Sequence, residues 1–483
     1  MINSKIILRF FGLVLIIEGL FMLLSSVIAL IYDEGDFYSF IVSAVICIGV
    51  GGLTAILTNK AKRYIGKREG YIMVTMVWIV FSFFGLLPFI ISNTIPSFTD
   101  AFFETMSGFT TTGSSVLNNI ESLPHGILFW RSIIQWLGGM GIIVLSLAIL
   151  PVLGVGGMQL FEAEVPGITP DKLHPRITDT AKRLWVIYVA FTGIEIVLLI
   201  LGGMSVFDSV CHSFTTMATG GYSTKQASIA HWNSPYIHYV ITLFMFIAGM
   251  NFTLSYALFK GRIERLREND ELKFYILSVL IFTLIIASGL FITEKDYGIE
   301  KSFRIAIFQV VSIITTTGYA TADYMTWIPF LGVILFLLMF FGGSAGSTGG
   351  GIKMVRIHLL VKNSRYELKR LIHPNAVIPV RFNGRAVPQS ILYNVLAFVV
   401  IYLLIIGISM IIMSMMGFDL QTSLGAVATS LGNIGPGFNE LGPAYSFSEV
   451  PALGKWFLSF LMLVGRLELF TVIILFSTHF WKN

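Results

Sequence analysis

The chain has 483 residues, of which 55% are apolar and only 12% carry a charge. Soluble domains contain about 25% charged residues, so this chain lacks the polar surface that several soluble domains would need. The composition therefore excludes a soluble multidomain enzyme and indicates an integral membrane protein, in agreement with a mean hydropathy of +0.81. The net charge of +5 does not indicate a nucleic-acid partner, because the basic residues lie in short segments between apolar stretches.

The N-terminal segment carries Lys5 and Arg9 ahead of an apolar run that extends to Ile31. This run is longer than the roughly 7–15-residue core of a signal peptide, and no small-residue cleavage pattern follows it. We therefore interpret it as the first membrane span. The two cysteines, Cys47 and Cys211, show neither metal-ligand spacing nor a disulfide framework.

Membrane spans can be predicted from length, because a helix needs about 20 apolar residues to cross the hydrocarbon core. Ten segments meet this requirement: 6–31, 38–58, 71–93, 130–152, 184–204, 236–259, 274–293, 329–352, 389–416 and 454–480. Four further apolar stretches are too short to span: 99–112, 207–219, 302–317 and 419–434. With a cytoplasmic N-terminus, the inner segments hold 25 of the 32 basic residues, as the positive-inside rule requires. We therefore expect both termini inside and the four short stretches on the outer side.

The short stretches form an internal repeat. They end in Phe109-Thr110-Thr111-Thr112-Gly113, Thr216-Met217-Ala218-Thr219-Gly220, Ile314-Thr315-Thr316-Thr317-Gly318 and Leu431-Gly432-Asn433-Ile434-Gly435. Each stretch lies between two spans, so a unit of span, short helix, tight loop and span occurs four times. We expect an all-α integral membrane protein with four pseudo-symmetric repeats around one pore, at 71–152, 182–260, 273–361 and 389–480. Residues 1–60 add two extra N-terminal transmembrane helices.

Four short helices that end in glycine-bearing loops suggest a cation site. Non-helical backbone is tolerated at membrane depth only where it is buried in protein or lines a wet cavity. Loops around one axis can turn carbonyls toward that axis and replace the water shell of a cation. Glycine permits the required dihedral angles, and the negative C-terminal ends of the helices favour a cation. The alternative is four re-entrant turns whose glycines are only structural, as in aquaporin-like folds.

With the run from Gly342 to Gly351, these repeats resemble the Trk/Ktr/HKT superfamily of potassium transporters. The two extra spans and the length are most similar to the Trk-H type membrane subunit of the Trk potassium uptake system, over nearly the whole chain. The resemblance implies a potassium filter lined by backbone carbonyls of the loops 110–113, 217–220, 315–318 and 432–435. The expected carbonyls belong to Thr111, Thr112, Gly113, Ala218, Thr219, Gly220, Thr316, Thr317, Gly318, Asn433, Ile434 and Gly435.

Two details of this filter bear on selectivity. Family members with Ser in the first loop tend to admit sodium, so Gly113 implies potassium selectivity. The fourth loop, Asn433-Ile434-Gly435, departs from the Thr-x-Gly pattern of the others, a variation that is itself seen in the family.

The glycine run 342–351 interrupts the span that begins near Ile328. From the residues alone it is either a bend where helices pack tightly or a segment that changes shape. It is not a phosphate-binding loop, because Ile352 and Lys353 follow it rather than Lys and Ser or Thr. The resemblance implies an intramembrane gate under the filter, formed by Gly342, Gly343, Gly346, Gly349, Gly350, Gly351 and Lys353.

Arg466 lies in the last predicted span, where a charge is costly and usually functional. The resemblance implies that it projects into the pore below the filter and opposes ion passage. The alternative is an ion pair with a carboxylate of a neighbouring helix, such as Glu195 or Glu104.

Two carboxyls inside predicted spans, Glu18 and Glu195, leave a second function open. We expect hydrogen bonds between helices to satisfy them, but they also permit proton- or sodium-coupled symport. An intramembrane enzyme would need a nucleophile–base pair or a metal constellation, and the sequence contains none, so no enzymatic activity is expected.

The partners follow from the resemblance. It implies a homodimer in the bacterial inner membrane that docks a cytosolic Trk-A type ring of nucleotide-binding domains on the inner loops 153–181, 260–273 and 353–388. Potassium would be the substrate, and no cofactor is expected in this chain because nucleotide would act only through the partner. The basic stretches 60–68 and 353–385 are expected to contact anionic lipid rather than nucleic acid.

Overall fold

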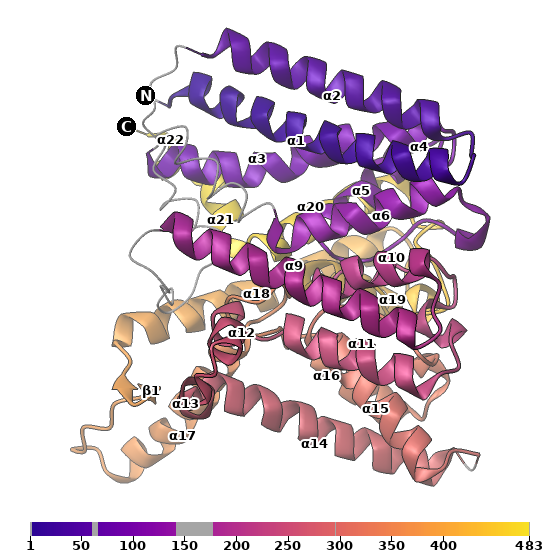
Figure 1. Ribbon diagram of the computed structural model, residues 1–483. Helices are drawn as coiled ribbons and strands as arrows, with labels where there is room; N and C mark the ends of the chain where they lie inside the picture. The colour runs from indigo at the N-terminus through magenta and orange to yellow at the C-terminus, as the bar shows by residue number, and fades with distance from the viewer. Residues whose placement is uncertain (1, 60–65, 142–176, 295, 483) are drawn as a thin grey trace.

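The computed structural model describes residues 2–59, 66–141, 177–294 and 296–482, and this part of the chain is mostly helical. Long helices run side by side, and both termini lie at the end of the molecule that also carries α17 and β1 (Figure 1). The one sheet in the described ranges is a hairpin of β1 (Arg381–Phe382) and β2 (Arg385–Ala386). The expectation of an all-α chain is confirmed.

Six of the predicted spans are long apolar helices in the described part of the chain. They are α1 (Ser4–Ile31), α2 (Phe37–Leu57), α3 with α4 (Lys67–Gly85 and Leu87–Ile91), α9 (Ile177–Leu201), α14 (Asp270–Thr293) and α18 (Gln389–Met415). Many large apolar side chains on these helices are exposed, among them Leu53, Leu284 and Leu404. Exposed apolar surface of this extent fits contact with lipid.

The two N-terminal helices, α1 and α2, pack closely through small residues. A Cβ built on Gly12 would lie 2.7 Å from the Gly51 carbonyl oxygen, and a Cβ built on Gly51 would lie 2.5 Å from the Gly12 carbonyl oxygen. Small residues at such positions let helix backbones approach within a membrane. The pair lies along one edge of the molecule, next to α3 (Figure 1).

Two predicted spans are bent rather than straight. The helices α11 (Pro235–Ala248) and α12 (Phe252–Phe259) meet at 110°, and α20 (Ala452–Arg466) meets the segment Leu469–Phe476 at 116°. The latter segment consists of α21 (Leu469–Ile473) and the short helix η6 (Ile474–Phe476). Each of the spans predicted over 236–259 and 454–480 therefore consists of two helices joined at a sharp bend.

Polar contacts stabilise both bends. At the first, the Gly249 carbonyl accepts a hydrogen bond from the Ser344 N–H at 2.8 Å, and the Asn251 side chain caps α12. At the second, Glu468 has a left-handed backbone with φ 58° and forms an ion pair with Arg356. Each bend thus depends on a segment distant in the chain.

The span predicted over 329–352 is interrupted, as the glycine run indicated. Helix α16 (Pro329–Leu338) ends before the run, and α17 (Met354–Ile372) begins after it. The span predicted over 130–152 begins earlier, with α6 (His125–Trp136), and continues into a π-turn over Leu137–Gly141. The remainder of that prediction, and the inner loop up to residue 176, lie outside the described residues.

The four short apolar stretches are helices that follow their predicted places: α5 (Phe98–Phe109), α10 (Val206–Met217), α15 (Ile299–Ile314) and α19 (Leu420–Gly432). Side chains of Ser97, Ser205 and Asp419 cap three of them at the N-terminus. Hydrogen bonds from Thr422 lower the pKa of the Asp419 carboxyl. The remaining short elements are α13 (Ile263–Glu268), α22 (Thr478–Trp481), η1 (Ile120–Ser122), η3 (Ser228–His231), η4 (Tyr324–Thr326) and η5 (Asn439–Leu441).

Candidate functional site

The four short helices end in loops with the same backbone conformation. The first loop residue is left-handed in each: Thr111 (φ 53°), Thr219 (φ 55°), Thr316 (φ 59°) and Asn433 (φ 55°). The glycine two positions later also has positive φ: Gly113 (86°), Gly221 (76°), Gly318 (80°) and Gly435 (105°). The middle residue donates its N–H to the carbonyl five positions back at 2.8–3.0 Å, as in a Schellman helix end. These shared features align the loops residue by residue.

This alignment corrects the register expected for the second loop. The sequence pattern placed Ala218, Thr219 and Gly220 opposite Thr111, Thr112 and Gly113. In the structure, Ala218 caps α10 with right-handed backbone (φ −74°), and the equivalent residues are Thr219, Gly220 and Gly221. The helix end decides the register, because only Gly221 has the positive φ found at Gly113.

The loops form a closed ring at the level of their middle residues. A Cβ built on the glycine of each loop would collide with the middle carbonyl oxygen of the next loop, or come close to it. From the built Cβ to the carbonyl oxygen, the distances are 2.2 Å for Gly113 and Gly220, 1.9 Å for Gly221 and Thr317, 1.8 Å for Gly318 and Ile434, and 2.9 Å for Gly435 and Thr112. The cycle returns to its first member, so four backbone carbonyls surround one axis.

Side chains just after the second and third loops tie neighbouring repeats together. The Tyr222 hydroxyl donates to the Glu104 carbonyl at 2.8 Å, and the Tyr319 hydroxyl donates to the His212 carbonyl at 3.2 Å. Glu104 and His212 occupy equivalent places, seven residues before the first residue of their own loops. The same kind of contact thus joins the first repeat to the second and the second to the third.

A buried ion pair fixes the first loop, and sequence reasoning missed it. Arg131 of α6 contacts Glu104 of α5 at 2.9 Å, and both side chains are almost fully buried. Glu104 also accepts from the Ser115 hydroxyl at 3.0 Å and from the Val116 N–H at 2.9 Å. The Arg131 guanidinium stacks over the Tyr222 ring, 4.2 Å from its centroid. No sequence pattern linked Glu104 to Arg131, because they lie on different helices and contact each other only after folding.

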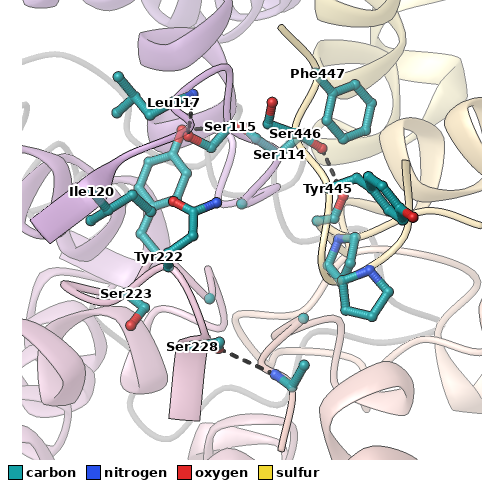
Figure 2. A pocket seen from close by; sticks show the side chains of 18 of the residues that line it. Ser114, Ser115, Leu117, Ile120, Tyr222, Ser223, Ser228, Tyr445, Ser446 and Phe447 are labelled. Carbon is teal, nitrogen blue, oxygen red and sulfur yellow. Dashed lines mark hydrogen bonds between the residues drawn. The ribbon is translucent and has the colours of Figure 1, made fainter. Parts of the chain in front are cut away.

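A cavity of about 80 Å³ opens on one end of the ring. All four loop glycines line it, together with Lys225 and with residues that follow the loops. Figure 2 shows Ser115 and Tyr222 on one side of this space and Tyr445 and Phe447 on the other. One water molecule needs about 10–15 Å³ of cavity volume, so the cavity has room for several water molecules.

The glycine run lies at the other end of the ring. Its Thr348 hydroxyl donates to the Met217 carbonyl at 3.1 Å, and its Gly350 N–H donates to Thr316 Oγ1 at 2.7 Å. Lys353 Nζ, just beyond the run, donates to the Gly349 carbonyl at 2.7 Å. Positive φ occurs in this run only at Gly346 and Gly351. The run thus contacts the residues at which the short helices end, opposite the cavity.

Arg466 joins the glycine run to the first repeat. Its guanidinium donates to the Thr348 carbonyl at 2.5 Å and to the Gly138 and Gly139 carbonyls at 2.5 and 3.0 Å. Neither carboxylate proposed as its partner pairs with it, since Glu104 binds Arg131 and Glu195 forms no ion pair within the described ranges. The alternative interpretation of Arg466 as a partner of Glu104 or Glu195 is therefore wrong.

Comparison with known proteins decides the family. The family model described as TrkH, cation transport protein, matches residues 38–482. The chain is 42% identical to the Trk system potassium uptake protein TrkH of Escherichia coli K12 and 40% identical to that of Halomonas elongata, with all of each chain covered. The crystal structure of the potassium transporter TrkH from Vibrio parahaemolyticus matches over all of both chains, with a TM-score of 0.89 and 38% identity. The chain belongs to the TrkH family.

Membership of the TrkH family confirms the resemblance drawn from the four loops and the glycine run. The structural match also confirms the expected fold class, a multi-pass helical membrane protein. The family consists of cation transport proteins, so the expectation that the chain is not an enzyme holds as well.

One buried carboxyl of this TrkH-family chain differs from expectation. Glu18 is fully buried, and its oxygens have no hydrogen-bond partner among the described residues. We expected a hydrogen bond between helices at this position. A Cβ built on Gly85 of α3 would lie 3.0 Å from Glu18 Oε1. Glu18 of α1 therefore fills space beside a residue of the first repeat that has no side chain.

Proposed function

We propose that this chain is a potassium-selective uptake protein of a bacterial inner membrane, in which the four loops form the filter. The observation that carries the proposal is the closed ring of loop glycines and middle carbonyls. Neutral carbonyl dipoles can replace the hydration shell of a monovalent cation and still release it. The C-terminal ends of α5, α10, α15 and α19 add negative potential at the same place. The names of the relatives, Trk system potassium uptake proteins, support potassium as the ion.

The proposed filter consists of three residues from each loop. They are Thr111, Thr112 and Gly113; Thr219, Gly220 and Gly221; Thr316, Thr317 and Gly318; and Asn433, Ile434 and Gly435. The cavity beyond the loop glycines would be the outer vestibule. The glycine run and Arg466 would close the pathway below the filter.

Replacing Gly113 with serine is expected to weaken the preference for potassium over sodium. A Cβ at this position would lie 2.2 Å from the Gly220 carbonyl oxygen, so that carbonyl must move and the ring must change shape. Rubidium uptake into proteoliposomes, competed by potassium or by sodium, measures the preference. We expect potassium alone to inhibit the unmodified protein and both ions to inhibit the variant.

Gly203→Ser is the matched control, because Gly203 also has positive φ (88°) but has no atom within 4 Å of a built Cβ. Equal inhibition of the unmodified protein by both ions would contradict the proposed selectivity. An unchanged preference in Gly113→Ser would contradict the place of the first loop in the filter.

Replacing Arg466 with alanine is expected to raise rubidium uptake several-fold. The change removes a positive charge from the proposed pathway and three hydrogen bonds that hold the glycine run to the first repeat. Arg466→Lys keeps the charge but has fewer hydrogen-bond donors, so its uptake should lie between that of the unmodified protein and that of Arg466→Ala. Reduced uptake together with a lower melting temperature would assign Arg466 a structural role instead.

The proposed partners are a second copy of this chain and a cytosolic Trk-A type regulatory subunit. Helices α13 and α17 and the β1–β2 hairpin offer the inner surface for that subunit, at the end of the molecule where both termini lie (Figure 1). The proposed topology places this end in the cytoplasm. Nucleotide would act through the partner alone, and the chain itself would hold only the transported ion.

Ion-coupled symport is the second candidate function, and the buried, unpartnered carboxyl of Glu18 favours it. Symport requires uptake to depend on a proton or sodium gradient across the membrane. The same rubidium assay decides between the two functions when an ionophore collapses each gradient in turn. Uptake that continues under both conditions favours the filter pathway without coupling.

A further inference from the structure

One side-chain hydrogen bond connects the glycine run directly to the ring of loops. The Gly350 N–H donates to Thr316 Oγ1 at 2.7 Å, and both residues are buried. Thr316 is the first, left-handed residue of the third loop. The run is therefore bonded to a residue of the ring itself, in addition to its contacts with the surrounding helices.

The equivalent positions of the other loops lack such a bond in the described part of the chain. The Thr111 hydroxyl is buried without a hydrogen-bond partner. The Thr219 hydroxyl donates to the adjacent Ala218 carbonyl at 2.6 Å. The Asn433 amide donates to Thr112 Oγ1 at 2.8 Å and to the Met462 carbonyl at 2.9 Å. The third loop is thus distinguished from its three counterparts by its side-chain bond to the glycine run.

The run reaches Thr316 because two of its residues, Gly349 and Gly350, have no side chains. A Cβ on Gly349 would lie 2.8 Å from the Thr315 carbonyl oxygen, and a Cβ on Gly350 would lie 2.6 Å from the Gly432 carbonyl oxygen. Thr315 is the C-cap of α15, and Gly432 is the last residue of α19. Glycine at 349 and 350 therefore brings the run against the inner ends of the third and fourth short helices.

We propose that Thr316 is a positioning residue that latches the glycine run to the third loop. This inference rests on the proposed function, in which the run is the gate and the third loop is part of the filter. While the run is in place, its N–H fixes the Thr316 side chain. When the run withdraws, the first residue of the third loop loses that contact, so the gate and the filter are coupled through one hydrogen bond.

Removing the acceptor tests the latch. Thr316→Val keeps the side-chain shape but leaves the buried Gly350 N–H without a partner. The free-energy cost of this unsatisfied group shifts the equilibrium between the run in place and the run withdrawn about tenfold toward withdrawal. Thr316→Ser restores the hydroxyl and should restore the latch. Thr111→Val removes the equivalent hydroxyl of the first loop, which has no bond to the run, and isolates the effect of losing a loop hydroxyl.

Cysteine modification reports the position of the run independently of transport. Ser347 lies within the run, its hydroxyl is buried without a partner, and both native cysteines are buried. In the full chain carrying Ser347→Cys, reconstituted in proteoliposomes, a charged methanethiosulfonate reagent measures how often the run is accessible. We expect about tenfold faster modification with Thr316→Val, and the parent rate with Thr316→Ser and with Thr111→Val.

An unchanged modification rate in Thr316→Val, or equal acceleration in Thr111→Val, would overturn the latch. Thr316→Ala removes the same acceptor with less bulk and serves if the valine variant does not fold. Rubidium competition on the same samples separates the two proposals. Selective uptake with an unchanged modification rate overturns the latch alone, whereas unselective uptake in the parent overturns the filter.

Discussion

Replacing Gly221 with alanine is expected to abolish potassium-selective uptake. Gly221 has φ +76°, where an alanine costs roughly 1–2 kcal/mol. Its Cβ would also lie 1.9 Å from the Thr317 carbonyl oxygen, so the backbone of the third loop must move. That carbonyl belongs to the ring proposed to hold the ion, and the displacement should destroy the site. Rubidium uptake with potassium and sodium competition measures the loss.

Two variants make this prediction specific. Gly417→Ala places alanine at a similar positive φ (+99°) with no atom within 4 Å of the Cβ, so uptake should persist. Gly220→Ala has ordinary φ, and the three atoms nearest its Cβ belong to the Gln135 side chain rather than to backbone, so we expect a smaller loss than with Gly221→Ala. A complete loss with Gly220→Ala but not with Gly221→Ala would restore the register expected from the sequence.

Breaking the buried ion pair is expected to cause the largest loss of stability. Arg131→Met leaves the Glu104 carboxylate buried without its cation, which costs about 3–5 kcal/mol. The variant should melt at a markedly lower temperature in detergent and lose uptake, because Glu104 also holds the Ser115 hydroxyl and the Val116 N–H beyond the first loop. Thermal unfolding of the purified protein measures the effect.

The control is an exposed pair on α17. Glu367→Gln removes the partner of Arg370 at the surface, where a salt bridge contributes less than about 1 kcal/mol. Combining Arg131→Met with Glu104→Gln removes the uncompensated charge, so part of the lost stability should return. A melting temperature for Arg131→Met equal to that of Glu367→Gln would contradict a structural role for the buried pair.

The membrane spans and the short helices could be predicted because both depend on local composition. Apolar length alone identified α1, α2, α9, α14 and α18, and the four short helices lie where their apolar stretches indicated. Hydropathy does not distinguish a straight span from a bent one, because both are equally apolar. The breaks after α11 and α20 depend on Ser344 and Arg356, which approach from distant parts of the chain.

By itself, the sequence determined the membrane class, the four-fold repeat, the glycine-bearing loops and the interruption by the glycine run. These are properties of short segments, whose composition limits the backbone they can adopt. Only the tertiary structure decided the register of the second loop, the pairing of Arg131 with Glu104, the partners of Arg466 and the bond between Gly350 and Thr316. Each depends on which groups meet after the repeats pack around one axis, and residues up to 328 positions apart come into contact there.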